Sequence, residues 1–587
     1  MSRMLRPRMV LAGVGVLAVL VLQLSAIPAA FTIDECNYLS TVSGLRHGTL
    51  FVPGTAGLPA SKALYAFEPA ASGLHGVSTP VAPRVPPLYA GVALPFSILG
   101  WPGLVLMNVL GFVITLMLVY AVARHLGGSD GVGAIAALLW GLGGYAVEYA
   151  QGVWPHTSGL ALLTGGLVLA GLTAERDHAY LPLLAGLLLA TAVGFRYQNA
   201  IGLASAALIV VVWARRRWRS GLLFLAGAAG PLALASWMNH VRIGGGSPIS
   251  KGSGYVSAQA GRHFSRGYEI AMTLWSRVVD YASLPPFPGR GLSFFRRLPG
   301  GELVAVGVMK KALLQSSPWM AVGLVVLGLA FTRWAPPDER ARRGLRMLAV
   351  PVAAVLAAIA LAGIYRHDGL TFNQRYLLDI GPLVAVATAL AIGALPERRL
   401  RLGLATGAGA LAALGSLLLT GPAATFLLQR CVPIVFALVA VVLWLWARRH
   451  GRLKPLVASA VAACLGWSAT VHLGADLPAS RRLRSLHELA MERFEPIVRP
   501  DTPTAIVVNA GNKDAICPMI LDHDLVLVDA SLDETARLPG LLSALADQRR
   551  VLVWLDGMPP ERARAVVSGF TATPVPAEPF RVLELTR

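Results

Sequence analysis

Two adjacent carboxylates, Asp34 and Glu35, stand directly after the first long apolar run of the chain. A carboxylate can act as a general base that takes a proton from an acceptor hydroxyl or amine. A negative charge beside a sugar carbon also favours a transition state in which positive charge develops on that carbon. A solvated loop acid is the alternative, but the position immediately after a membrane span favours function. We therefore predict that Asp34 and Glu35 serve catalysis at a membrane surface.

Glu148 is a second acid, near the end of a later apolar run and eight residues before His156. An ionisable group at membrane depth is costly, so it needs a partner or a wet cavity. On the same side of the bilayer, Asp34 and Glu148 could hold a divalent cation or share the roles of base and positioning group. A hydrogen-bonded interfacial glutamate is the alternative. His156 is expected to line the interface or support the substrate rather than to bind a metal.

Basic residues on the same side of the membrane could bind the substrate. Arg196 and the pair Arg375-Tyr376 each touch the end of an apolar run in a short connection. Short outer loops normally carry few basic residues. Arginine binds phosphate through a planar fork of donors, so these residues, with His367 nearby, are predicted to bind a lipid phosphate or pyrophosphate. Snorkelling towards phospholipid headgroups is the alternative.

The composition indicates the class of protein that must position these groups. The chain has 587 residues, of which 55% are hydrophobic and 14% charged, whereas a soluble domain carries about 25% charged residues. A polytopic membrane protein is therefore predicted. The formal net charge of +20 comes from arginines between apolar runs, as the positive-inside rule describes. Membrane lipid is an expected partner and nucleic acid is not.

About thirteen membrane-spanning helices are predicted from the apolar runs. The first, from Val10 to about Ala30, is expected to be retained rather than cleaved as a signal peptide, because it is longer than a usual signal core. Arginines before it place the N-terminus in the cytoplasm. Alternate connections are rich in arginine, which agrees with this count. The other spans are expected at about 101–123, 131–150, 156–173, 180–196, 199–213, 220–239, 317–333, 345–364, 375–394, 402–420, 431–447 and 455–473.

The predicted topology divides the chain into a membrane domain, 1–473, and a small outer domain, 474–587. The membrane domain has two long outer loops, at about 31–100 and 240–316. In the outer domain, strand-like runs alternate with helix-like stretches, which predicts an α/β fold with a partly parallel sheet. We expect a multi-pass protein of the plasma (inner) membrane with its C-terminal domain outside the cytoplasm.

Two further patterns in the chain carry less weight. The run Asp522-His523-Asp524 is interpreted as a solvated turn rather than a metal site. Cys36 and Cys517 could both face an oxidising compartment. Their separation in sequence neither supports nor excludes a bridge, and we expect them to be unpaired.

Four local patterns resemble the GT-C superfamily of lipid-linked-sugar glycosyltransferases. That superfamily includes protein O-mannosyltransferases, lipid A aminoarabinose transferases and related bacterial membrane glycosyltransferases. The resemblance covers about residues 30–395. The patterns are the acid pair after the first span, Pro86-Pro87-Leu88-Tyr89, the stretch from Asn239 through Gly246-Ser247-Pro248 to Gly254-Tyr255, and Thr371 to Leu378 ahead of Pro382.

The resemblance implies a GT-C-like fold and transfer of a sugar from a polyprenyl-phosphate carrier to a glycan, lipid or protein acceptor at the outer face. It implies that Asp34 is the catalytic or metal-linked acid, that Glu148 is the second acid, and that Arg375 and Arg196 contact the donor phosphate. Asn373-Gln374 replaces the smaller residues usual in the family, so the donor pocket is expected to differ. No nucleotide cofactor is expected, and a divalent cation is left open.

Other functions remain alternatives from the sequence. A flippase for lipid-linked sugars would use the same basic outer side, but it would need ionisable residues near the midplane and inverted repeats. A ligase that transfers a whole lipid-linked glycan would share the chemistry with a longer donor. A purely structural scaffold is the third alternative, against which the long outer loops argue.

Overall fold

The structure is a computed structural model, and parts of both long loops lie outside the residues that it describes. His367 and the predicted span 402–420 also lie outside them, so both stay predictions. The described residues are 13, 15–59, 61–64, 80–83, 85–244, 246–249, 265–281, 295–297, 303–305, 308–335, 338–362, 372–393, 422–450, 454–499, 501–509, 512–531 and 537–587.

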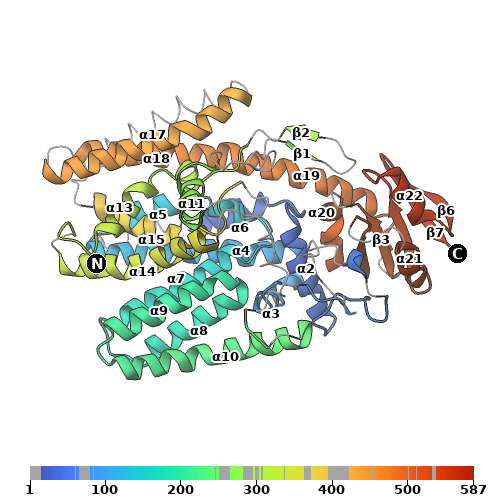
Figure 1. Ribbon diagram of the computed structural model, residues 1–587, viewed down its shortest axis with the longest axis horizontal. Helices are drawn as coiled ribbons and strands as arrows, with labels where there is room; N and C mark the ends of the chain where they lie inside the picture. The colour runs from blue at the N-terminus through green and yellow to red at the C-terminus, as the bar shows by residue number, and fades with distance from the viewer. Residues whose placement is uncertain are drawn as a thin grey trace.

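Apolar helices form the body of the molecule and run along its long axis (Figure 1). A helix satisfies its own backbone hydrogen bonds, which a bilayer requires. The long helices α4 and α10 both end where glycine, at 128 and 244, adopts a positive φ, as helix C-termini favour. The helices of the body are α4 (Gly100–Gly127), α5 (Asp130–Gly141), α7 (His156–Leu172), α8 (Tyr180–Phe195), α9 (Ala200–Trp213), α10 (Arg217–Ile243), α13 (Met320–Leu329), α14 (Glu339–Ala362), α15 (Gly381–Ile392), α17 (Pro422–Arg449) and α18 (Lys454–Val471).

Within the described part of the chain, 5 helices are long and apolar enough to cross a membrane, by length and composition. Shorter apolar helices lie between them, including an N-terminal one at Gly15–Leu24. The polytopic helical architecture is confirmed, while the total of about thirteen spans stays a prediction. The 5 long helices are Phe96–Gly127, Arg217–Ile243, Glu339–Ala362, Phe426–Arg449 and Pro455–Phe494.

Two predicted spans differ from the helices observed. The run 131–150 is divided into α5 and a short helix α6 (Ala146–Ala150), because glycines interrupt it and the Gly143 carbonyl accepts a bond of 2.8 Å from the Trp319 indole. The run 375–394 becomes α-helical only at Gly381, after the 3-10 helix η7 (Leu378–Ile380), and Pro382 favours a helix start there. Both changes matter for function, because Glu148 then lies in the short helix α6 between α5 and α7, and Arg375 lies on the connection before α15.

One long helical rod joins the membrane domain to the C-terminal domain (Figure 1). It consists of α18, the π-helical turn η9 (His472–Asp476) and α19 (Leu477–Phe494). The rod passes through the predicted domain boundary at 474 without a break, so a helix and not a flexible linker connects the two parts. The division into domains remains a prediction.

The C-terminal domain is built on a 5-stranded sheet with the order β4-β3-β5-β7-β6. Strand β3 pairs in parallel with β4 and β5, whereas β7 is antiparallel to β5 and β6. Helices α21 (Leu538–Ala546) and α22 (Pro560–Val567) follow β4 and β5. A small, partly parallel α/β domain therefore agrees with the prediction. The strands are β3 (Thr504–Val508), β4 (Leu525–Asp529), β5 (Arg550–Trp554), β6 (Thr571–Ala577) and β7 (Phe580–Thr586).

The central strand β3 packs against hydrophobic cores on both faces of the sheet. Its five residues are all buried, with Ile506 and Val508 in the main core and Ala505 and Val507 in a second core with α21. The second core also includes Val52, from the first long loop. One face of the sheet is thus covered by α21 together with Val52, and the other face packs into the main core.

A disulfide joins Cys36 to Cys517, with a Cα–Cα distance of 5.6 Å. It ties α2 (Ile33–Arg46) to the 3-10 helix η10 (Cys517–Leu521). The Ser43 hydroxyl, which donates to the Ile520 carbonyl at 3.0 Å, reinforces the contact. The expectation of unpaired cysteines was wrong, because only the folded chain shows that residues separated by 481 positions meet.

Candidate active site

Asp34 and Arg375 come together although 341 positions separate them in the sequence. Asp34 lies in the first turn of α2, where a negative charge is favourable to the helix dipole. Arg375 comes from the connection before α15, with its guanidinium carbon 5.1 Å from the centre of the Tyr376 ring. Asp34 and Arg375 form an ion pair in which the Asp34 side chain is 35% exposed and the Arg375 side chain 15% exposed. The predicted acid and the predicted phosphate-binding arginine therefore share one partly open site.

Arg196 supports Arg375 from within the protein. Its guanidinium pairs with the Asp379 carboxylate at 2.5 Å and donates to the Arg375 carbonyl at 3.0 Å. Gln198 donates to the same carboxylate. Arg196 is only 5% exposed, so in this structure it positions the backbone of Arg375. A direct contact of Arg196 with a donor phosphate stays a prediction.

Glu35 has surroundings quite different from those of its neighbour Asp34. Successive residues of a helix point about 100° apart, and Glu35 points into the core with no exposure. Its carboxylate accepts bonds from the backbone N–H groups of Phe31 (2.5 Å) and Val153 (2.9 Å). Both terminal nitrogens of Arg484, on α19, donate to it at 3.1 Å. These contacts fix the start of α2 to α19, and none of them leaves Glu35 facing the open site.

Glu148 lies at the centre of a buried polar network. Its two oxygens accept from the Phe372 N–H at 3.2 Å and from the Asn373 amide at 2.7 Å. The same amide nitrogen donates to Asp476 at 2.9 Å, and Lys311 donates to that carboxylate at 2.7 Å. The network joins α6, the rod of α18 and α19, and the two connections that lead into α12 (Leu313–Ser316) and α15.

The charge state of Glu148 follows from this burial. Glu148 lies in the short helix α6 beyond α5. Burial, with a smaller effect from the nearby carboxylate of Asp476, raises its pKa to about 7. The bonds from Asn373 and Phe372 and the charge of Lys311 oppose the rise. A carboxyl group with such a pKa can gain or lose a proton near neutral pH.

His156 and Tyr376 take different positions beside these groups. His156 is buried and its ring stacks on Tyr149 with 4.7 Å between centroids. No hydrogen-bond partner of its Nδ1 is found among the residues that the structure describes. Tyr376 is half-buried and receives a bond of 3.3 Å from Arg375. Tyr376 thus supports the guanidinium directly, whereas His156 forms part of the aromatic packing.

Asp34 and Glu148 have separate partners in this structure, and a divalent cation held by the two acids stays a prediction. Asp34 pairs with Arg375, whereas both oxygens of Glu148 accept from Phe372 and Asn373. Within the described ranges, no group of three or more His, Cys, Asp or Glu side chains could hold a metal ion. In the C-terminal domain, His523 contacts Glu495 at 3.1 Å and Asp524 pairs with Arg549 at 2.8 Å.

The sequence analysis did not single out four residues that support the candidate site: Asp379, Asp476, Lys311 and Arg484. Their side chains are at most 4% exposed. Ionisable residues beside apolar runs are costly unless they are paired, and this rule could have found Asp379 and Asp476. Their partners are set by the fold alone, since Lys311 and Asp476 lie 165 positions apart.

Solved structures with a similar fold were found for this chain. ArnT from Cupriavidus metallidurans in the apo state matches with a TM-score of 0.52 and 14% identity, over 98% of this chain and 97% of ArnT. The same protein bound to undecaprenyl phosphate matches with a TM-score of 0.51 and 14% identity, over 98% and 97% of the two chains. The Archaeoglobus fulgidus oligosaccharyltransferase in the apo form has a TM-score of 0.41 and 12% identity, over 95% and 71%.

Neither a family model nor a curated protein sequence matches the chain. ArnT is a GT-C membrane glycosyltransferase, and the match covers nearly the whole of both chains. The chain therefore has the GT-C fold, which confirms the fold that the local sequence patterns predicted.

Proposed function

We propose that this chain is a membrane glycosyltransferase that moves a sugar from a polyprenyl-phosphate carrier to an acceptor at the extracytoplasmic face. The observation that carries the proposal is the meeting of Asp34 and Arg375 in a partly open site. An acid for the acceptor and a cation for the donor phosphate are the two groups that the reaction needs. The GT-C fold supports the same conclusion.

The ion pair suggests how the donor prepares the site. Without substrate, the Arg375 guanidinium is held by the Asp34 carboxylate. A donor phosphate offers the guanidinium a bidentate partner of higher charge, so donor binding frees Asp34. The acceptor oxygen then bonds to the sugar carbon while Asp34 takes its proton. The bond from that carbon to the phosphate oxygen breaks, and its electron pair stays on the phosphate beside Arg375.

The choice of a polyprenyl carrier has separate support. ArnT, which shares the fold, has been observed bound to undecaprenyl phosphate. In this chain the site lies where apolar helices end, beside the start of α7 and before α15. A lipid whose tail stays in the bilayer could therefore present its phosphate to Arg375.

The outer face is supported by the disulfide two residues after Asp34. Cys36 and Cys517 are bonded, and disulfides persist in oxidising compartments outside the cytoplasm. Arginine-rich connections at the other ends of the helices, such as Arg215 to Arg217, agree with a cytoplasmic position there.

The proposal is tested with purified full-length protein, polyprenyl-phosphate sugars and a membrane extract, measuring released polyprenyl phosphate. Asp34→Asn should lower release by about 10²–10⁴-fold, the usual contribution of a general base. Arg375→Ala should weaken donor binding, measured as a higher KM. The control is Asp522→Asn, which removes a carboxylate that is 68% exposed in the C-terminal domain.

The outcomes separate the alternatives. Unchanged turnover in Asp34→Asn would remove Asp34 from the mechanism, and unchanged donor affinity in Arg375→Ala would remove the phosphate assignment. Movement of the lipid across a vesicle membrane with no release of carrier would favour a flippase. Transfer of only multi-sugar donors would favour a ligase.

A further inference from the structure

Besides the candidate active site, a second cavity with a volume of about 560 Å³ lies between α4, α7, α14 and α15. Helix α7 begins at His156, next to the candidate active site, and its last residues Gly171 and Leu172 line the cavity. A helix of 17 residues spans roughly 25 Å at 1.5 Å per residue. These two residues are therefore at the opposite end of α7 from the candidate active site, while Pro382 and Leu383, in the first turn of α15, also line the cavity. Neither the Asp34–Arg375 pair nor its supports Arg196 and Asp379 line it.

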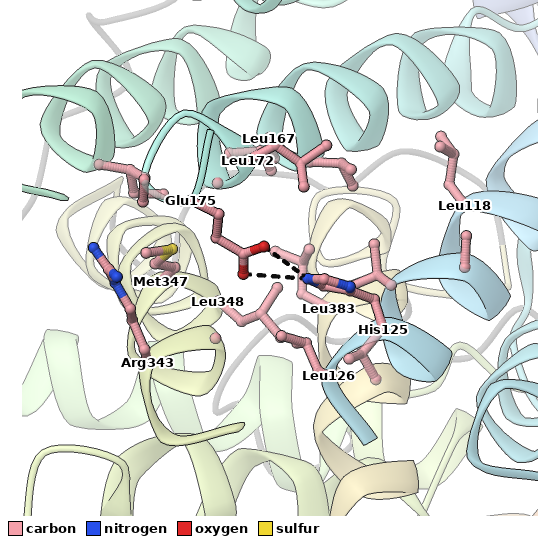
Figure 2. A pocket seen from close by; sticks show the side chains of 18 of the residues that line it. Leu118, His125, Leu126, Leu167, Leu172, Glu175, Arg343, Met347, Leu348 and Leu383 are labelled. Carbon is pink, nitrogen blue, oxygen red and sulfur yellow. Dashed lines mark hydrogen bonds and ion pairs between the residues drawn. The ribbon is translucent and has the colours of Figure 1, made fainter. Parts of the chain in front are cut away.

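The inner wall of the cavity is apolar. Figure 2 shows Leu118, Leu167, Leu172, Met347 and Leu383 around it, from α4, α7, α14 and α15. Its volume is in the usual range of ligand cavities, roughly 300–1,000 Å³. Because it lies between helices that are apolar enough to meet lipid, a hydrocarbon chain is the ligand that suits this wall.

The mouth of the cavity is basic. It is lined by Arg215, Arg340 and Arg343. Among the residues that the structure describes, no carboxylate pairs with any of these three arginines. Arg343 donates one bond of 3.2 Å, to the Trp213 carbonyl. Three guanidinium groups therefore remain available to an anion.

Two carboxylates also line the cavity, and each contacts a basic side chain. Glu175 is 2.9 Å from the His125 ring nitrogen, the contact drawn in Figure 2. Glu339 pairs with Arg342. These pairs reduce the repulsion that the acids would exert on an anionic ligand, and the mouth keeps an excess of positive charge.

We propose that this cavity binds an anionic phospholipid from the leaflet at this end of the helices. The phosphate group lies on Arg215, Arg340 and Arg343, and one acyl chain fills the apolar interior. Basic pockets between membrane helices bind anionic headgroups in this way, and the planar guanidinium matches a phosphate. The site is separate from the proposed glycosyl transfer, and its test does not depend on that activity.

The headgroup is tested by lipid exchange on the full-length protein in nanodiscs of phosphatidylcholine with added phosphatidylglycerol, followed by native mass spectrometry. The double variant Arg215→Ala with Arg343→Ala should retain phosphatidylglycerol about thirtyfold less well than the wild type. The matched control is Arg216→Ala with Arg346→Ala, which removes two neighbouring charges that do not line the cavity. Equal losses in both double variants, or no loss in the first, would overturn the proposal.

The acyl chain is tested by filling the cavity. A Cβ at Gly171 would meet only the Met347 sulfur, at 3.9 Å, so Gly171→Leu fits the backbone and occupies the interior. Gly221→Leu is the matched control, because a Cβ there also has a single neighbour at 3.9 Å and lies outside the cavity. We expect loss of bound phosphatidylglycerol in Gly171→Leu alone. Full retention in Gly171→Leu, or equally tight binding of phosphatidylcholine by the wild type, would contradict the proposed occupant.

Discussion

Asp34 and Glu35 show how the surroundings of a residue determine its role. Both are acids in the first turn of α2. Asp34 meets Arg375 where both side chains are partly open to solvent, whereas Glu35 is fully buried on Arg484 and backbone N–H groups. We infer that Asp34 serves the reaction and that Glu35 holds the helix that carries it. Stability measurements can separate these two roles.

Glu35→Gln is expected to destabilise the protein strongly. It leaves the Arg484 charge buried without its carboxylate, and breaking a buried pair costs about 3–5 kcal/mol. Asp34→Asn breaks a partly exposed pair, for which the loss is about 1 kcal/mol or less. Thermal unfolding followed by intrinsic fluorescence should show a much larger drop in melting temperature for Glu35→Gln. The reverse order would mean that Asp34 and not Glu35 anchors α2.

Glu148 should make the stability of the protein depend on pH near neutrality. Its pKa is about 7 in the folded state against the ordinary 4.5, so the folded state keeps a proton that the unfolded chain releases. The stabilisation is fully present below pH 4.5 and is lost as the pH rises through 7. A difference of this size corresponds to an effect on the order of 3 kcal/mol.

Glu148→Gln tests this dependence because glutamine stays neutral. Relative to the wild type, the variant should gain melting temperature between about pH 5 and pH 8 as the wild-type carboxyl ionises. Glu561→Gln, on the surface helix α22, provides the control and should follow the wild type. Parallel curves for the wild type and Glu148→Gln would show that the buried network keeps Glu148 ionised throughout.

At the scale of helices and strands, the sequence predicted what local chemistry determines. Apolar runs such as 101–123 and 156–173 became α4 and α7 with small changes at their ends. Strand-like runs in the tail became β3, β4 and β5. Glycines divided the run 131–150, a break that hydropathy alone does not register. Local patterns also singled out Asp34 and Arg375, since both lie beside the ends of apolar runs.

The contacts between distant elements could not be predicted in the same way. Arg484 reaches Glu35 across 449 positions, and Cys36 reaches Cys517 across 481. Such pairs depend on how α2 packs against α19 and the C-terminal domain, and a single sequence contains no local signal of that packing. The supports of the candidate site were therefore missed, while its exposed residues were found.

The disulfide between α2 and the C-terminal domain leads to a prediction about how these two elements are held together. Replacing both cysteines, Cys36→Ser with Cys517→Ser, should lower stability by about 2–4 kcal/mol, because the bond constrains a very long loop of the unfolded chain. The C-terminal domain should also become more sensitive to limited proteolysis. Cys431→Ser, which replaces an exposed free cysteine, is the control. Protein whose Cys36 and Cys517 both react with maleimide before reduction would contradict the bond.

Over the whole molecule, the two ends of the helical body carry different chemistry. One end holds the Asp34–Arg375 pair and is joined by the α18–α19 rod and the disulfide to the C-terminal domain (Figure 1). The other end holds the basic mouth of the second cavity (Figure 2). We expect the first end to face the oxidising side of the membrane and the second end the cytoplasm.

Cysteine labelling of whole cells and inverted vesicles tests this orientation. In a Cys431→Ser background, Ser568→Cys places an exposed thiol on the C-terminal domain and Arg216→Cys places one on the exposed turn between α9 and α10. A membrane-impermeant maleimide should label Ser568→Cys from outside the cell and Arg216→Cys only in inverted vesicles. The physical reason is that the turn carries Arg215, Arg217 and Arg219, which resist translocation. Labelling of both thiols from the same side would place the C-terminal domain and the turn between α9 and α10 in one compartment. That result would contradict the predicted orientation of the helices, and with it a transfer at the outer face.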